Sequence, residues 1–139
     1  MKKVTIIVII CFVALALIAS GVIIIAGNIR KNLKQLEAEQ FGAIDLSEIE
    51  DGEYIGSFSV FPVAAKVKVT IVDHEITKID ILEHDNGRGK SAEVITEDII
   101  EQQSLDVDVI TGATHSSKVI LLAVEDALEK AQEQSQQSQ

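Results

Sequence analysis

The sequence has a single cysteine, a single proline and no tryptophan. One cysteine excludes an intrachain disulfide and a thiolate metal cluster. Cys11 lies within an apolar run, where we interpret it as a small hydrophobic residue. The three histidines, His74, His84 and His115, are scattered and form no metal-ligand spacing. The only proline, Pro62, marks a turn between predicted strands.

Charge is absent from residues 4–26, which read VTIIVIICFVALALIASGVIIIA. At about 1.5 Å per residue, this run is long enough for a helix to cross a hydrocarbon core about 30 Å thick. The alternative is a cleaved signal peptide with a small-residue site at Ala19–Gly21. Because the apolar run continues past that site, we predict an uncleaved, single-pass membrane anchor.

Basic residues are scarce in the rest of the chain. Only Lys2 and Lys3 precede the apolar run, so ten of the twelve Lys and Arg residues and all 22 acidic residues follow it, a balance of −12. Nucleic-acid-binding surfaces and surfaces that lie on anionic lipid are usually basic. We therefore predict no nucleic acid partner. Two basic residues precede the run, and three follow it closely: Arg30, Lys31 and Lys34. Because these two numbers are nearly equal, the positive charges do not fix the orientation of the run in a membrane.

Composition divides the chain into four parts. We predict a membrane anchor over residues 1–27, a stalk and linker over 28–50, a folded domain over 51–131 and a disordered tail over 132–139. The turn signal Asp51-Gly52 opens the domain. The tail, QEQSQQSQ, has too little apolar content to pack.

The first half of the domain alternates in hydrophobicity, which is typical of half-buried strands. The predicted strands cover residues 53–61, 66–72 and 75–82. In the third, Ile79 and Ile81 share a face with Thr77. Asp73 and His74 form a tight hairpin, since Asp and His tolerate positive φ better than most residues.

The second half has helical periodicity. A helix is predicted over residues 91–103, followed by a short extended segment and a second helix. The apolar stripe of the second helix consists of Ile120, Ala123, Ala127 and Ala131, flanked by Val124 and Leu128. Short connections between the strands favour an antiparallel sheet with the helices on one face. The predicted fold class is therefore α+β.

Small and hydroxyl residues gather where the second helix begins. These are Thr111, Gly112, Ala113, Thr114, Ser116 and Ser117. In one interpretation Thr114 or Ser116 is an ordinary helix N-cap. In the other, the positive end of the helix dipole and its unpaired N–H groups bind a phosphate. A nucleotide-binding P-loop is excluded, because its glycine-lysine spacing is absent.

The stretch DVITGAT, residues 108–114, resembles the flavinylation motif of the FMN-binding domain family. This domain occurs in the FMN subunits of sodium-pumping NADH:quinone oxidoreductases and Rnf-type complexes, and in small envelope proteins of bacterial extracytosolic electron transfer. The opening DGEYIGSF, the hairpin VKVTIVDHEITKIDILEH and residues 87–131 are similar to the family as well. The resemblance covers residues 51–131.

The resemblance implies covalent FMN. In the family, a flavin transferase that uses FAD as donor links FMN through its phosphate to the last Thr of the motif, which here is Thr114. Asp108, Thr111, Gly112 and Ala113 would form the recognition motif. Ser116 and Ser117 would add donors at the helix start. His115, which we expect to point outward, has no assigned role.

The segment HDNGRGKSA replaces the Glu-Thr-Pro-Gly stretch of larger family members. Gly87 and Gly89 would allow close approach of the flavin ring, and Arg88 would stabilise a reduced, anionic flavin. The alternative is a solvated loop. For His84 as a general acid or base, the sequence assigns no partner carboxylate.

The leading hypothesis is a single-pass FMN protein of the cell membrane, with its domain outside the cytosol, that relays electrons between redox proteins or quinone. It is a carrier or redox subunit rather than a self-sufficient enzyme. The alternative is a membrane-tethered adaptor or assembly subunit with the same fold and no flavin. A noncovalent flavin sensor or reductase is a third hypothesis.

Overall fold

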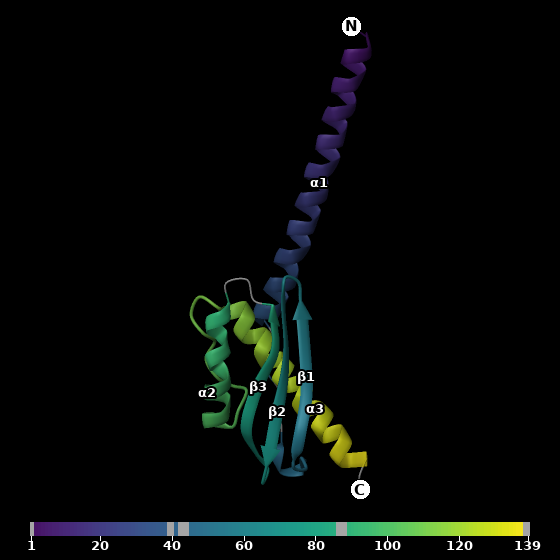
Figure 1. Ribbon diagram of the computed structural model, residues 1–139. Helices are drawn as coiled ribbons and strands as arrows, with labels where there is room; N and C mark the ends of the chain where they lie inside the picture. Colours follow the sequence, from purple (N-terminus) through teal and green to yellow (C-terminus); the bar gives the residue numbers. More distant parts are fainter. Residues whose placement is uncertain (1, 39–40, 42–44, 86–88, 138–139) are drawn as a thin grey trace. The chain divides into compact units, whose positions relative to one another are not determined.

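The computed structural model describes residues 2–38, 41, 45–85 and 89–137 (Figure 1). The chain divides into two compact units, Met1–Asn32 and Leu33–Gln139. The helix α1 spans Lys2–Ala38, so it includes residues 28–38 of the predicted stalk. Its last turns belong to the second unit, where Leu36 is buried in the core.

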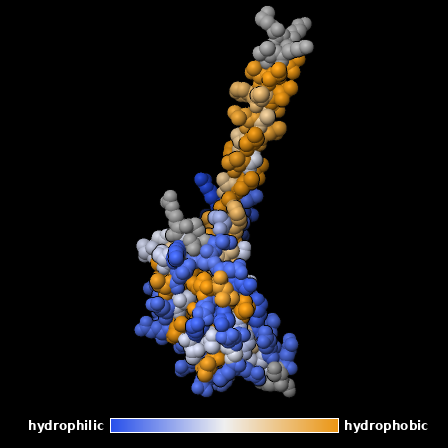
Figure 2. Space-filling view, viewed as in Figure 1, coloured by the Kyte–Doolittle hydropathy of each residue, from blue (hydrophilic) through white to orange (hydrophobic). Residues whose placement is uncertain are grey.

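The N-terminal part of α1 has no polar face. Between Ile6 and Ile25 its large apolar side chains are 54–75% exposed, and Figure 2 shows them as continuous apolar surface. A helix on the surface of a globular protein normally has one apolar stripe and an opposite polar face. Within the described part of the chain, Thr5–Leu36 is the one helical segment long and apolar enough to cross a membrane.

The second unit is an antiparallel sheet covered by helices. The strands β1 (Gly52–Val60), β2 (Val63–Val72) and β3 (Glu75–Asp85) pair in the order β1-β2-β3. They are followed by the 3₁₀ helix η2 (Lys90–Val94) and by α2 (Ile95–Gln102) and α3 (Thr114–Gln137); a short 3₁₀ helix, η1 (Leu46–Glu48), precedes the sheet. The predicted α+β fold is confirmed.

Both hairpin turns lie where the sequence predicted them. Asp73 and His74 have φ of 53° and 63°, so the turn between β2 and β3 uses the left-handed region at both positions. Turns of this kind match the natural twist of paired strands. Phe61 and Pro62 form the turn between β1 and β2.

A β-bulge changes which residues of β3 face the core. The register between β2 and β3 shifts between Thr70 and Ile71. As a result Thr77 is exposed, whereas Ile76 is buried. The prediction that Thr77 shares a face with Ile79 was wrong, because simple alternation cannot anticipate the extra residue of a bulge.

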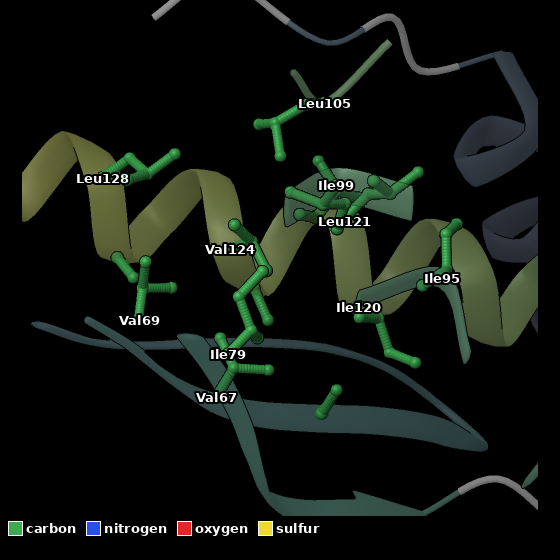
Figure 3. Packing of buried hydrophobic residues seen from close by; sticks show 14 of the residues in the cluster. Val67, Val69, Ile79, Ile95, Ile99, Leu105, Ile120, Leu121, Val124 and Leu128 are labelled. Atoms are coloured by element: carbon green, nitrogen blue, oxygen red, sulfur yellow. The ribbon is translucent and has the colours of Figure 1, made fainter. Parts of the chain in front are cut away.

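The core lies on both sides of α3. Figure 3 shows Val67, Val69 and Ile79 of the sheet on one side of this helix and Leu105 on the other. Leu121, which was not part of the predicted stripe, is fully buried. A helix covered on two sides is apolar around most of its circumference, which is why Val119–Val124 contains no polar residue.

The helix α3 crosses β1 in very close contact at Gly56. A Cβ atom there would collide with the carbonyl oxygen of Ala123 and the backbone nitrogen of Ala127. The absence of a side chain at Gly56, together with the small Ala123 and Ala127, allows the helix backbone to lie directly on the strand.

The C-terminal residues continue α3. The prediction of a disordered tail is wrong for residues 132–137, which are helical. Ser135 is 3% exposed. Its Oγ accepts a hydrogen bond from the Glu50 N–H at 3.0 Å and donates one to the Ala131 carbonyl at 2.9 Å. Within residues 132–137, Ser135 therefore holds the helix to the chain before β1 through polar contacts that hydropathy does not reveal.

Side chains occupy both outer edges of the sheet. At β1, the Ser57 N–H donates to the Asp126 carboxylate at 2.8 Å, and Lys130 pairs with the same carboxylate. At β3, the Gln103 amide accepts from the Ile76 N–H at 2.7 Å and donates to the Ile76 carbonyl at 2.8 Å. Unpaired strand edges are sites where other chains add, so these contacts protect the sheet.

We expect Gln103→Ala to lower the free energy of unfolding by about 2 kcal/mol, because it leaves the half-buried backbone groups of Ile76 without the amide. Gln103 also ends α2 in the left-handed region with φ of 50°, and alanine tolerates that conformation poorly. Urea denaturation followed by circular dichroism measures the loss. Gln102→Ala, at the exposed neighbouring position, should change stability by less than about 0.5 kcal/mol.

Candidate functional site

The start of α3 is held by backbone hydrogen bonds around Ala113. Ala113 donates its N–H to the Ile110 carbonyl and accepts from the Ser117 N–H, both at 2.9 Å. Its carbonyl thus accepts the first bond of the helix, which makes Ala113 the N-cap residue. Alanine has no side-chain oxygen. The interpretation of Thr114 or Ser116 as the ordinary N-cap was therefore wrong, since Thr114 is the first helical residue.

The turn before the helix requires glycine. Gly112 has φ of +80°, a conformation that side chains rarely adopt. Its surroundings are open, because a Cβ atom there would meet nothing within 4 Å. The constraint at this position is therefore conformational, and the space above Gly112 is accessible from outside.

The two serines of the first turns are buried. Ser116 and Ser117 are 3% and 0% exposed. The Ser117 Oγ accepts a hydrogen bond from the Ile110 N–H at 3.0 Å, and its own N–H is used within the helix. Ser117 thereby ties the loop to α3, and its role is to hold the turn in shape.

A small open pocket lies at this end of α3. Its volume is about 170 Å³, and its lining consists of Val63, Gly89, Gly112, Ala113, Thr114, His115 and Ser116. The start of β2, the residue before η2 and the start of α3 therefore meet there. His115, expected to point outward, is half-buried and belongs to the lining. Among the lining residues that the structure describes, it is the only one with a titratable side chain.

The pocket suits a phosphate better than a whole flavin. Sites that enclose a drug-sized ligand usually have volumes of about 300–1,000 Å³, which is well above 170 Å³. A phosphate group fits, and the first N–H groups of a helix favour its negative charge. An FMN bound by its phosphate would therefore extend its ring beyond the lining residues.

The structure brings together four of the predicted site residues in the lining of the pocket. Gly112, Ala113, Thr114 and Ser116 line one pocket. Asp108 and Thr111 are exposed outside this lining, and Ser117 is buried beneath it. The predicted ring contacts Gly87 and Arg88 lie outside the described residues. In the parts that are described, no group of three or more His, Cys, Asp or Glu residues is placed to hold a metal ion.

One polar pair beside the pocket was missed by the sequence. His84 has a side chain that is 3% exposed, and its Nδ1 lies 3.0 Å from Oε1 of Glu93. The sequence assigned no carboxylate to His84, and this was wrong. Nothing in the spacing of the two residues signals the contact, because it depends on where the folded chain places η2 relative to the end of β3.

The comparison with known families agrees with this geometry. Residues 63–129 match the FMN-binding domain family. This range includes β2, β3, η2, α2 and most of α3. It also includes all of the residues that line the pocket. No curated protein matches the chain. Residues 63–129, just under half of the chain, therefore form a domain similar to those of the FMN-binding domain family.

Proposed function

We propose that the protein carries FMN covalently, as a phosphodiester on the Thr114 hydroxyl. The observation that carries the proposal is the position of Thr114, which lines the pocket at the first residue of α3. Because Ala113 is the N-cap, the helix start does not depend on the Thr114 hydroxyl as a cap. A phosphodiester keeps one negative charge, which the positive end of the helix stabilises.

The attachment is a transfer from FAD by a flavin transferase. The Thr114 oxygen attacks the phosphorus of the FMN half, the bond between the two phosphates breaks, AMP leaves and the threonine proton goes to solvent. Linkage through the phosphate leaves the isoalloxazine ring unmodified and able to accept one or two electrons. The redox chemistry belongs to the flavin, and the protein supplies position and electrostatic environment.

We further propose that the flavin relays electrons at the cell membrane. The apolar N-terminal segment of α1 supports membrane anchoring. A covalent tether suits a domain outside the cytosol, where a dissociated FMN would not be replaced. The partners on this proposal are redox proteins or quinone. Protease digestion of intact cells and of spheroplasts tests the side of the membrane, and full protection of the domain would reverse the assignment.

The second candidate is an adaptor or assembly subunit with the same fold and no flavin. The observation in its favour is the size of the described pocket, about 170 Å³, which does not enclose a flavin ring. The two candidates differ in a single measurable property, the mass of the mature protein.

Intact mass spectrometry of the full chain from its natural host tests the proposal. We expect a mass increment of FMN less one water, on a peptide that contains Thr114, and a yellow colour that persists after denaturation and dialysis. Protein made without a transferase is the control and should be colourless. An unmodified mass would support the adaptor, and colour lost on denaturation would indicate noncovalent flavin.

A further inference from the structure

His84 places a buried imidazole near the end of β3, with its side chain 3% exposed. It lies opposite Ala65 of β2, which is 4% exposed and faces α3. The same end of the sheet contributes Val63 to the pocket. Burial of a polar side chain is unfavourable unless it is hydrogen-bonded. The contact of His84 with Glu93 at 3.0 Å satisfies this requirement on one side of the ring.

Glu93 belongs to η2, the 3₁₀ helix that begins directly after the pocket residue Gly89. Gly89 is buried, lines the pocket and accepts a hydrogen bond from the Ala92 N–H at 2.9 Å. The Glu93 carbonyl accepts from the Thr96 hydroxyl at 3.0 Å, which joins η2 to α2. The position of Gly89 is therefore coupled to the position of Glu93 through the turn of η2.

The pair closes a segment of the chain at both of its ends. His84 precedes Gly89 and Glu93 follows it, and the paired positions are nine residues apart in the sequence. A contact between residues on either side of Gly89 restricts the positions that Gly89 can take. The only part of this segment that lines the pocket is Gly89, among the residues that the structure describes.

We infer that His84 and Glu93 are a positioning pair, which holds Gly89 against the first turn of α3 and so shapes the pocket around Thr114. The consequence for the flavin rests on the proposed function. With the pair intact, the wall opposite Thr114 is fixed when the transferase delivers the FMN phosphate. With the pair broken, η2 loses its side-chain contact with β3, and the acceptor site is formed for only part of the time.

Three variants and one control test the pair. Glu93→Ala and His84→Phe remove the hydrogen bond, whereas Glu93→Gln keeps an acceptor oxygen for a neutral imidazole N–H. The matched control is His74→Asn. His74 is also a histidine bonded through its ring, since its Nδ1 lies 3.0 Å from the Ile49 carbonyl, and asparagine tolerates its φ of 63°.

Hydrogen exchange on the full chain, before flavin is attached, gives the first measurement. We expect the Ala92 N–H to exchange about tenfold faster in Glu93→Ala and His84→Phe, and within about twofold of the parent in Glu93→Gln and His74→Asn. Glu93 is 36% exposed, so its alanine variant should fold, which circular dichroism checks. If it does not, Glu93→Asp replaces it, because the shorter side chain withdraws the carboxylate from His84.

The rate of flavin incorporation by a transferase, with FAD as donor, gives the second measurement. It should fall about tenfold in the two variants without the hydrogen bond and recover in Glu93→Gln. If the Ala92 N–H exchanges at the same rate in Glu93→Ala as in the parent, the inference that the pair holds η2 is wrong, whether or not the parent accepts flavin. Faster exchange with normal incorporation overturns its role at the site. A parent that accepts no flavin contradicts the proposed function instead, and the exchange rate at Ala92 then decides whether the pair holds η2.

Discussion

Thr114→Val is expected to abolish covalent flavin, leaving the protein colourless after denaturation and its mass that of the bare chain. Valine keeps the branched shape of threonine but has no oxygen to form the phosphodiester. Since Thr114 is the first residue of α3 and Ala113 is the N-cap, the substitution removes no side-chain cap. The folded domain should therefore keep its stability within about 1 kcal/mol, despite the lower helix propensity of a β-branched residue.

Two controls make the Thr114 result specific. Thr114→Ser keeps a hydroxyl at the same position and should retain the modification, at a rate that reports how well the smaller side chain is held. Ser116→Ala removes a different hydroxyl of the same pocket and should leave the modified peptide unchanged. Should Thr114→Val still carry the FMN increment on another residue of the motif, the assignment of the attachment site would be wrong.

Gly56→Ala should unfold the domain or come close to it. The added Cβ collides with backbone atoms of Ala123 and Ala127 and lies 2.8 Å from the Ala127 Cβ. Overpacking of a core costs about 1–3 kcal/mol when side chains can adjust, and more when they cannot. Here the obstacles are backbone atoms of α3, so the helix would have to move away from β1. We expect a loss above about 3 kcal/mol, a large part of the stability of a small domain.

Thermal denaturation of the detergent-solubilised full chain, followed by circular dichroism, measures this effect. Gly52→Ala is the matched control on the same strand, because the atoms nearest to its Cβ would belong to the Tyr54 side chain, at 3.2–3.4 Å, and not to the backbone. If the Gly56→Ala protein has the same melting temperature as the parent, α3 packs less closely on β1 in solution than in the structure described above.

The sequence predicted the elements whose signals are local. Alternation located the three strands, the left-handed preference of Asp73 and His74 located the hairpin, and periodicity located α3. Each of these signals depends on a few neighbouring residues and on the geometry of one element. The family resemblance, carried by the motif at residues 108–114, added the prediction that Thr114 carries FMN.

The features that were missed depend on contacts between distant residues. Gln103 bonds the edge of β3, and Ser135 bonds the backbone of Glu50, and neither contact can be read from hydropathy. The bulge that exposes Thr77 follows from pairing with β2. The same holds for His84 and Glu93, which come into contact only when the chain between the sheet and α2 has folded.

The contacts of Gln103 and Asp126 at the two sheet edges have a consequence for crowding. Proteins confined to a lipid surface move in two dimensions and collide far more often than the same number free in solution. Strands with open edges would then join neighbouring copies into continuous, aggregation-prone sheets. One side-chain amide at β3 and one carboxylate at β1 disfavour that fibre-like growth, so that copies held on a lipid surface, as proposed, would stay separate molecules.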